Sequence, residues 1–223
     1  MIKHIKIFGE RNSGTKFLEA LLRNNISNIN MYYNSYCGGT GWKHGFPRLE
    51  LFNDLNATLF IFIIRDLESW LISMYNNPYH FIRPDNIGTF LSEKLHIHDS
   101  RMDHDVHIYK DEQQSIIDLR YAKIKSYERF FDKVPNAIFI NLGDLQHNNV
   151  KFLQFIRDTY SLNITDYIYR IESHTKNAAS YPNRIYDTVL PTIHNKDIEI
   201  EDMVASLKEA YRFKSDTYST PAI

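Results

Sequence analysis

IKIFGERNSGTKFLEALL, residues 5–22, is the stretch that decides the fold of this chain. A short apolar run predicts a buried strand that ends at Gly9, and a polar loop then closes on Ser13-Gly14-Thr15. The amphipathic pattern from Lys16 to Arg23 predicts a helix. Strand, loop and helix in this order direct the first N–H groups and the positive dipole end of the helix toward an anion.

The loop between the predicted strand and helix is rich in groups that bind anions. Gly14 lets the main chain approach an anion closely, and Ser13 and Thr15 add hydroxyl donors. Arg11 and Lys16 add positive charge. The alternative is a plain strand-to-helix turn in which Ser13 or Thr15 caps the helix, although capping alone requires fewer donors.

The spacing of the two glycines in this loop is that of a nucleoside-triphosphate P-loop, G-x-x-x-x-G-K-[ST]. The two residues after Gly14, however, are Thr15 and then Lys16, which is the reverse of the P-loop order. The hydroxyl that binds magnesium in an ATPase is therefore displaced. The stretch predicts a P-loop-like phosphate site without the magnesium ligand of an ATPase.

A second anion site is predicted after the most hydrophobic run of the chain, Thr58 to Ile64, which is typical of a parallel strand buried on both faces. Arg65 follows at its carboxyl end, and Asp66 is placed to cap the next helix. Ser73 lies about two helical turns later and can face the same pocket. Alternatively, Arg65 pairs with Asp66 or Glu68, and Ser73 is a small packing residue.

Hydrophobic periodicity predicts the remaining elements: strands at 29–33 and 136–142, and helices at 111–131, at 144–160 with Asp144 as the cap, and at 199–213. Alternating strands and helices predict an α/β fold, a three-layer sandwich with a central parallel sheet. Residues 1–223 are expected to form a single domain. An irregular insertion at about 76–106, with a short helix near 87–95, is a possible substrate lid.

The Gly-rich, aromatic stretch 34–47 is predicted to be a loop at a strand end, where loops of α/β proteins often carry chemistry. Lys43 and His44 are adjacent within it. The alternative is a surface histidine beside a solvated lysine. Aromatic residues either border the same cleft or belong to the core: Tyr32, Tyr33, Tyr36, Trp42, Tyr75, Tyr79 and Phe81.

Composition excludes several classes of protein. A formal net charge of −1, with 24% charged residues, favours neither nucleic acid nor an anionic membrane as a partner. The single Cys37 fits a reducing compartment, and no signal peptide or membrane-spanning run is expected. We therefore expect a soluble, cytoplasmic protein. Four histidines in the insertion, His96, His98, His104 and His107, lack cysteine companions, so no metal site is expected.

The two predicted anion sites together resemble those of sulfotransferases that use 3'-phosphoadenosine 5'-phosphosulfate (PAPS). The resemblance is carried by Glu10-Arg11-Asn12-Ser13-Gly14-Thr15 after the first strand and by Arg65-Asp66-x-x-x-Trp70-x-x-Ser73 after a central strand. It implies that the first loop holds the 5'-phosphosulfate, and that Arg65 and Ser73 hold the 3'-phosphate. A nucleotide phosphorylated at both ends of its ribose requires two such sites.

Three further segments are similar to this family, and one of them is Asp118-Leu119-Arg120-Tyr121 with Tyr127 and the strand end from Asn141 to Leu145. Lys43-His44-Gly45-Phe46-Pro47 resembles its Lys and His before a Pro, although the family commonly has one residue between them. The loop from Lys176 to Pro182 is similar to one that closes over the nucleotide. The main departure is Asn12, which stands where the family has a lysine before Ser-Gly-Thr. The resemblance implies that Arg11, Lys16 or Lys43 takes over the task of that lysine.

The resemblance implies a PAPS-dependent sulfotransferase that modifies a hydroxyl or an amine of a glycan or a small molecule, without a metal. His44 is the expected general base, with Glu10 as the alternative, and Lys43 and Lys16 are expected to stabilise developing charge. Two rivals are a nucleotide or small-molecule kinase and a non-catalytic PAP-binding protein. The sequence leaves the acceptor and the oligomeric state open.

Overall fold

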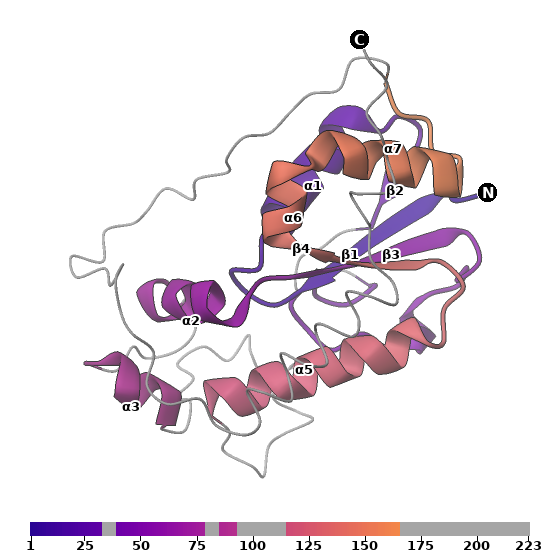
Figure 1. Cartoon of the computed structure of the whole chain (residues 1–223). Helices are drawn as coiled ribbons and strands as arrows, with labels where there is room; N and C mark the ends of the chain where they lie inside the picture. The colour runs from indigo at the N-terminus through magenta and orange to yellow at the C-terminus, as the bar shows by residue number, and fades with distance from the viewer. Residues whose placement is uncertain (33–38, 79–84, 93–114, 166–223) are drawn as a thin grey trace.

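The computed structural model describes residues 1–32, 39–78, 85–92 and 115–165, and these form an α/β fold around one parallel sheet (Figure 1). The strands are β1 (His4–Gly9), β2 (Asn30–Met31), β3 (Thr58–Ile64) and β4 (Ala137–Asn141). The helices are α1 (Thr15–Asn25), the 3-10 turn η1 (Leu49–Leu51), α2 (Leu67–Asn76), α3 (Ile87–Ser92), α5 (Ile116–Phe131), α6 (Leu142–His147) and α7 (Asn149–Tyr160). The predicted α/β class with a parallel sheet is confirmed.

The described strands lie in the order β2-β1-β3-β4, and every neighbouring pair is parallel. The pairing of β1 with β3 runs from His4 opposite Thr58 to Gly9 opposite Ile63. All seven residues of β3 are buried, which is why its sequence is continuously apolar rather than alternating.

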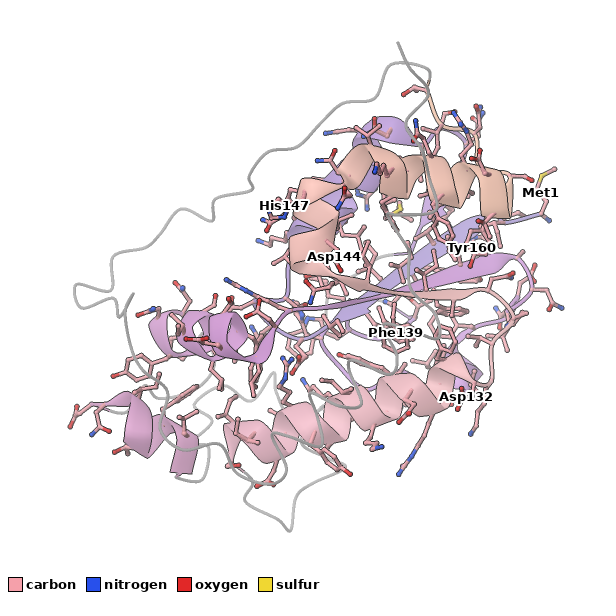
Figure 2. The ribbon with its side chains drawn as sticks, in the orientation of Figure 1. Met1, Asp132, Phe139, Asp144, His147 and Tyr160 are labelled. Carbon is pink, nitrogen blue, oxygen red and sulfur yellow. The ribbon has the colours of Figure 1, made fainter. Side chains whose placement is uncertain are left out.

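Helices cover both faces of the sheet, with α1, α6 and α7 on one face and α5 on the other (Figure 1). Alternate strand residues feed two separate cores because successive side chains point to opposite faces. The core under α1 and α7 is mainly aliphatic, whereas the core under α5 is mainly aromatic. Phe139 of β4 packs in the aromatic core with its ring centroid 5.0 Å from that of Phe62 (Figure 2).

The strand order places a topological switch point at β1. The chain leaves β1 toward β2 on one side and later returns through β3 on the other side. The carboxyl ends of β1 and β3 are therefore adjacent, and Gly9 pairs with Ile63 there. Open α/β sheets bind ligands in this position, because the loops that follow the two strands diverge and leave a crevice.

The helix predicted at 111–131 begins later, at Ile116, with Ser115 as its cap. The helix predicted after β4 also differs from the prediction. Asp144 does not cap a helix: it lies inside α6 (Figure 2). The cap of α6 is Asn141, whose Oδ1 accepts from the Gly143 N–H at 2.8 Å. Asn148 then departs from helical geometry, with φ of −126° and ψ of 33°, so the predicted helix is divided into α6 and α7. The first polar residue after β4 becomes the cap because the strand ends directly at Asn141.

Several predicted features lie outside the described residues: the helix at 199–213, the loop with Lys176, the four insertion histidines and most of the insertion itself. Within the insertion, the short helix expected near 87–95 is observed as α3. Among the described helices, none combines the length and apolar character needed to cross a membrane.

Candidate functional site

The loop between β1 and α1 turns sharply through two left-handed residues, Asn12 with φ of 61° and Gly14 with φ of 94°. Ser13 folds back inside this turn, and its N–H and its hydroxyl both donate to the Glu10 carbonyl, at 3.2 and 2.7 Å. Helix α1 starts at Thr15 with no side-chain cap. The alternative of a plain turn capped by Ser13 or Thr15 is therefore not observed, and the helix N-terminus keeps its capacity to bind an anion.

Asn12 links this loop to helix α2. Its amide Nδ2 donates to the carbonyl oxygens of Ser73 and Asn77, at 3.2 and 3.1 Å. The left-handed backbone, which asparagine tolerates well, turns the side chain toward α2 and away from the start of α1. Asn12 therefore contributes to the loop as a structural link, and its side chain does not take the place of a phosphate-binding lysine.

Arg65 extends from the end of β3 to the same loop. Its Nη1 donates to the Asn12 carbonyl at 3.3 Å. Asp66 instead caps α2, with Oδ1 accepting from the Ser69 N–H at 2.9 Å, and no ion pair among the described residues joins Arg65 to Asp66 or Glu68. Burial lowers the pKa of Arg65, and the nearby Asp66 opposes that shift. The two predicted anion sites are thus adjacent in space.

A contact between Arg11 and Trp42 joins the loop between β1 and α1 to the Gly-rich segment 39–47. The Arg11 guanidinium lies over the Trp42 ring, 4.5 Å from its centroid, and Arg11 is only 9% exposed. The Arg11 carbonyl accepts a hydrogen bond from the Trp70 indole at 2.8 Å. A stacked guanidinium is held in one orientation, so Arg11 presents its charge in a defined place.

His44 is half-buried, and its ring is hydrogen-bonded to the main chain of Gly9. Its Nδ1 lies 2.8 Å from the Gly9 carbonyl, which can only accept, so Nδ1 carries the proton and Nε2 keeps a lone pair. Burial lowers the pKa of His44 well below its ordinary value, and the positive charges of Lys43, Arg11 and Lys123 add to this shift against the Gly9 hydrogen bond. His44 is therefore suited to accept a proton through Nε2.

Lys43 lies against the first half of helix α1. Its Nζ is 3.8 Å from Glu19 Oε2, and the residue is 9% exposed, so it is not a solvated lysine. Burial lowers the pKa of Lys43, Glu19 opposes this shift, and the charge of Lys16 adds to it. Lys16 itself is exposed. A cation from another loop thus packs against α1, with Glu19 in the second turn of the helix as its described partner.

Glu10 faces the interior. It is 2% exposed, and its Oε2 pairs with Arg120 Nη1 of helix α5 at 2.5 Å. Burial raises the pKa of Glu10, while Arg120 and Lys123 oppose that shift. The carboxylate therefore has a partner inside the protein, and its exposure is much lower than that of His44.

Arg120 and Lys123 are the functional candidates that the sequence reasoning missed. Both lie on the buried face of α5, where Lys123 Nζ donates to the His44 carbonyl at 2.6 Å. The signal was present, since both cations fall at helical spacing with the apolar Ile116, Ile117 and Ile124. A charged residue on the apolar stripe of a helix is unusual unless it has a buried partner.

The described residues contain no cluster of acidic, histidine or cysteine side chains arranged to hold a metal ion. Lys176 lies outside them; of the other predicted site residues, Arg65 and Ser73 contact Asn12, whereas Glu10 faces the interior. In the comparisons with known proteins, no family model, curated protein or solved structure matched the chain. Its function is therefore inferred from the geometry of these residues.

Proposed function

We propose that this protein is a PAPS-dependent sulfotransferase with a P-loop-like nucleotide site, and that it transfers a sulfuryl group to a hydroxyl or amine of a glycan or small molecule. The observation that carries the proposal is the meeting of Arg65 with the loop before α1, through the hydrogen bond from Nη1 to the Asn12 carbonyl. It joins a cation at the end of β3 to an uncapped helix N-terminus at the end of β1. A nucleotide with phosphates at both ends of its ribose needs this pair of sites.

In this proposal, the start of α1 binds the 5'-phosphosulfate of PAPS. The main chain at Gly14 and Thr15 supplies N–H donors, and Lys16, Lys43 and Arg11 supply positive charge. Lys43 replaces the lysine that the resemblance leads one to expect at position 12. Lys43 is a reasonable replacement because the side-chain amide of Asn12 donates to main-chain carbonyls at α2 and not to the phosphosulfate.

Arg65 binds the 3'-phosphate in this proposal, together with the hydroxyl of Ser73. Ser73 lies on α2, and its carbonyl accepts from the Asn12 amide, so the same helix is joined to the loop that Arg65 reaches. Lys176 is proposed to close over the nucleotide. The site needs no contribution from Asn12 other than its main chain and its link to α2.

The acceptor oxygen or nitrogen attacks the sulfur of PAPS and forms the new bond to sulfur. The bond from sulfur to the bridging 5'-phosphate oxygen breaks, and 3'-phosphoadenosine 5'-phosphate (PAP) leaves with its electron pair. The acceptor proton passes to Nε2 of His44, which the Gly9 contact leaves able to accept it. Lys43 and Lys16 stabilise the charge that develops on the leaving oxygen. The greater burial of Glu10 and its pairing with Arg120 favour His44 over Glu10 as the base.

Calorimetry without magnesium tests the nucleotide site, with PAP compared with AMP, because these ligands differ only in the 3'-phosphate. We expect wild-type protein to prefer PAP by more than about tenfold, because a charge-assisted contact is worth about 1.5 to 3 kcal/mol. Arg65→Ala should lose this preference. Arg157→Ala, which removes an exposed arginine of α7, is the matched control and should keep it.

Equal binding of PAP and AMP by the wild type would refute the second anion site. ATP or ADP binding that is tighter than PAP binding and depends on magnesium would support a kinase instead. Protein that binds PAP is then supplied with labelled PAPS and a panel of glycan and small-molecule acceptors. Transfer that His44→Asn abolishes, with PAP binding retained, would support the assigned base, whereas binding without transfer to any acceptor would indicate a non-catalytic protein.

A further inference from the structure

Arg120 is a fully buried arginine, with 0% of its surface exposed, on helix α5. Its guanidinium makes two hydrogen bonds to residues far away in the sequence: Nη1 donates to Glu10 Oε2 at 2.5 Å, and Nη2 donates to the Arg65 carbonyl at 2.8 Å. The same group lies 4.6 Å from the centroid of the Trp70 ring. One side chain therefore contacts the residue after β1, the residue after β3 and the first turns of α2.

These contacts converge on the two arginines that line the proposed nucleotide site. Arg120 holds the main chain of Arg65 directly. Through the Trp70 ring, whose indole N–H donates to the Arg11 carbonyl, it also supports the main chain of Arg11. Both contacts are made to main-chain carbonyl oxygens, one of Arg65 and one of Arg11. The guanidinium groups of these two arginines take no part in them.

The energetic cost of this arrangement suggests a role beyond stability. A buried ion pair is rarely more stable than apolar residues of similar volume, because both charges lose their hydration. Here the compensation is incomplete, since within the described residues neither Glu10 Oε1 nor Arg120 Nε has a hydrogen-bond partner. Apolar residues at positions 10 and 120 together would avoid this cost, but they would not fix the carbonyl of Arg65.

We propose that Arg120 is a positioning residue that orients Arg65 for the 3'-phosphate, and so sets the preference of the site for a nucleotide that carries a 3'-phosphate in addition to its 5'-phosphate. This inference rests on the proposed function. Arg120 does not touch the nucleotide: it acts through the carbonyl of Arg65. Arginine is required because its planar fork donates in two directions at once, whereas lysine presents a single compact charge.

A double-mutant cycle on the PAP-to-AMP affinity ratio tests the proposal. Calorimetry is carried out on wild-type protein, Arg120→Lys, Arg65→Ala and the double variant. Arg120→Lys should lower the ratio by about tenfold and change AMP affinity by less than about threefold, a separation that general loss of structure would not produce. In the Arg65→Ala background, the same change should alter the ratio by less than about twofold, because its effect passes through Arg65.

Arg129→Lys is the matched control, since Arg129 is an exposed arginine on the same helix, and it should leave the ratio unchanged. If Arg120→Lys does not fold, as judged by circular dichroism, the pair Glu10→Gln with Arg120→Gln replaces it. That variant removes both buried charges together, which costs less than removing one, and it should show the same loss of preference.

The proposal is overturned if Arg120→Lys weakens PAP and AMP equally, or if its effect adds fully to that of Arg65→Ala. It is also overturned if the wild type prefers PAP and the Arg120 variants prefer it equally. A wild-type protein with no preference for PAP would remove the proposed function together with this inference, and that outcome is recognised before any variant is made.

Discussion

Acidification should destabilise the protein through His44, and His44→Asn should remove that sensitivity. Burial and neighbouring cations lower the pKa of His44 well below 6.5 in the folded state. Below pH 6.5 the unfolded chain therefore binds a proton that the folded chain does not. Stability due to this group is fully present above the unfolded pKa and is lost as the pH falls.

The size of this loss of stability follows from the one proton that His44 binds in the unfolded chain. Its limiting slope is about 1.4 kcal/mol per pH unit, and this slope is approached only below pH 6.5, where the unfolded histidine is more than half protonated. Lowering the pH from 7.5 to 5.5 should therefore cost about 1.4 kcal/mol. With a urea m value of about 2 kcal/mol/M, the unfolding midpoint should shift by about 0.7 M. At pH 7.5 His44→Asn should cost less than about 1 kcal/mol, because the asparagine amide can replace Nδ1 as donor to the Gly9 carbonyl.

Urea unfolding at pH 5.5, 6.5 and 7.5 measures this effect as the difference between the wild type and His44→Asn, so that contributions of the other histidines cancel. His147→Asn is the matched control: His147 also contacts a carbonyl through Nδ1, that of Gly143 at 2.7 Å, but it is exposed. That control should retain the wild-type pH dependence. If the wild type and His44→Asn respond identically to pH, the imidazole titrates freely in the folded protein and the reasoning for a neutral base fails.

Two further predictions concern the loop before α1, and urea unfolding measures both. Gly14→Ala should lower the free energy of unfolding by about 2 to 4 kcal/mol, because a left-handed backbone disfavours Cβ and the added methyl would overlap the Leu142 side chain. The control is Gly39→Ala, which has nothing within 4 Å of the new atom and should change stability by less than about 0.5 kcal/mol. A similar cost at both sites would contradict this reasoning. Asn12→Asp should lower the free energy of unfolding by about 2 kcal/mol or more, because a carboxylate would face two carbonyl oxygens that now accept from the amide. The control is Asn28→Asp, at an exposed left-handed asparagine, and it should leave stability unchanged.

Elements defined by a local pattern could be predicted from the sequence. The strand Thr58–Ile64 was predicted with its observed ends, since a continuous apolar run is what burial on both faces requires. Asp66 was also correctly predicted to cap α2, because it directly follows the end of β3 and Arg65. The cap at Asp144 was wrong, because Asn141 lies three residues earlier and the choice between them depends on where the strand ends.

The candidate site was predicted only in part. The meeting of the two predicted anion loops follows from parallel strand order, and the contact between Arg65 and Asn12 confirms it. The direction of individual side chains did not follow. Glu10 pairs with an arginine 110 positions away, and the turn that directs Asn12 to α2 depends on one left-handed residue. Pairings between residues so far apart in the sequence depend on the whole fold, so they cannot be predicted from a local sequence pattern.

Gly9 is the point where three segments of the chain meet. Its N–H donates to the Lys43 carbonyl at 2.9 Å, and its own carbonyl accepts from His44. A Cβ there would lie 2.5 Å from the Ile63 carbonyl and 2.7 Å from the Ser13 hydroxyl. Any other residue would therefore overlap both β3 and the loop before α1. If the proposed function holds, we expect this glycine to stay constant during divergence, together with Lys43 and His44, while other side chains of the segment 39–47 change and alter the choice of acceptor.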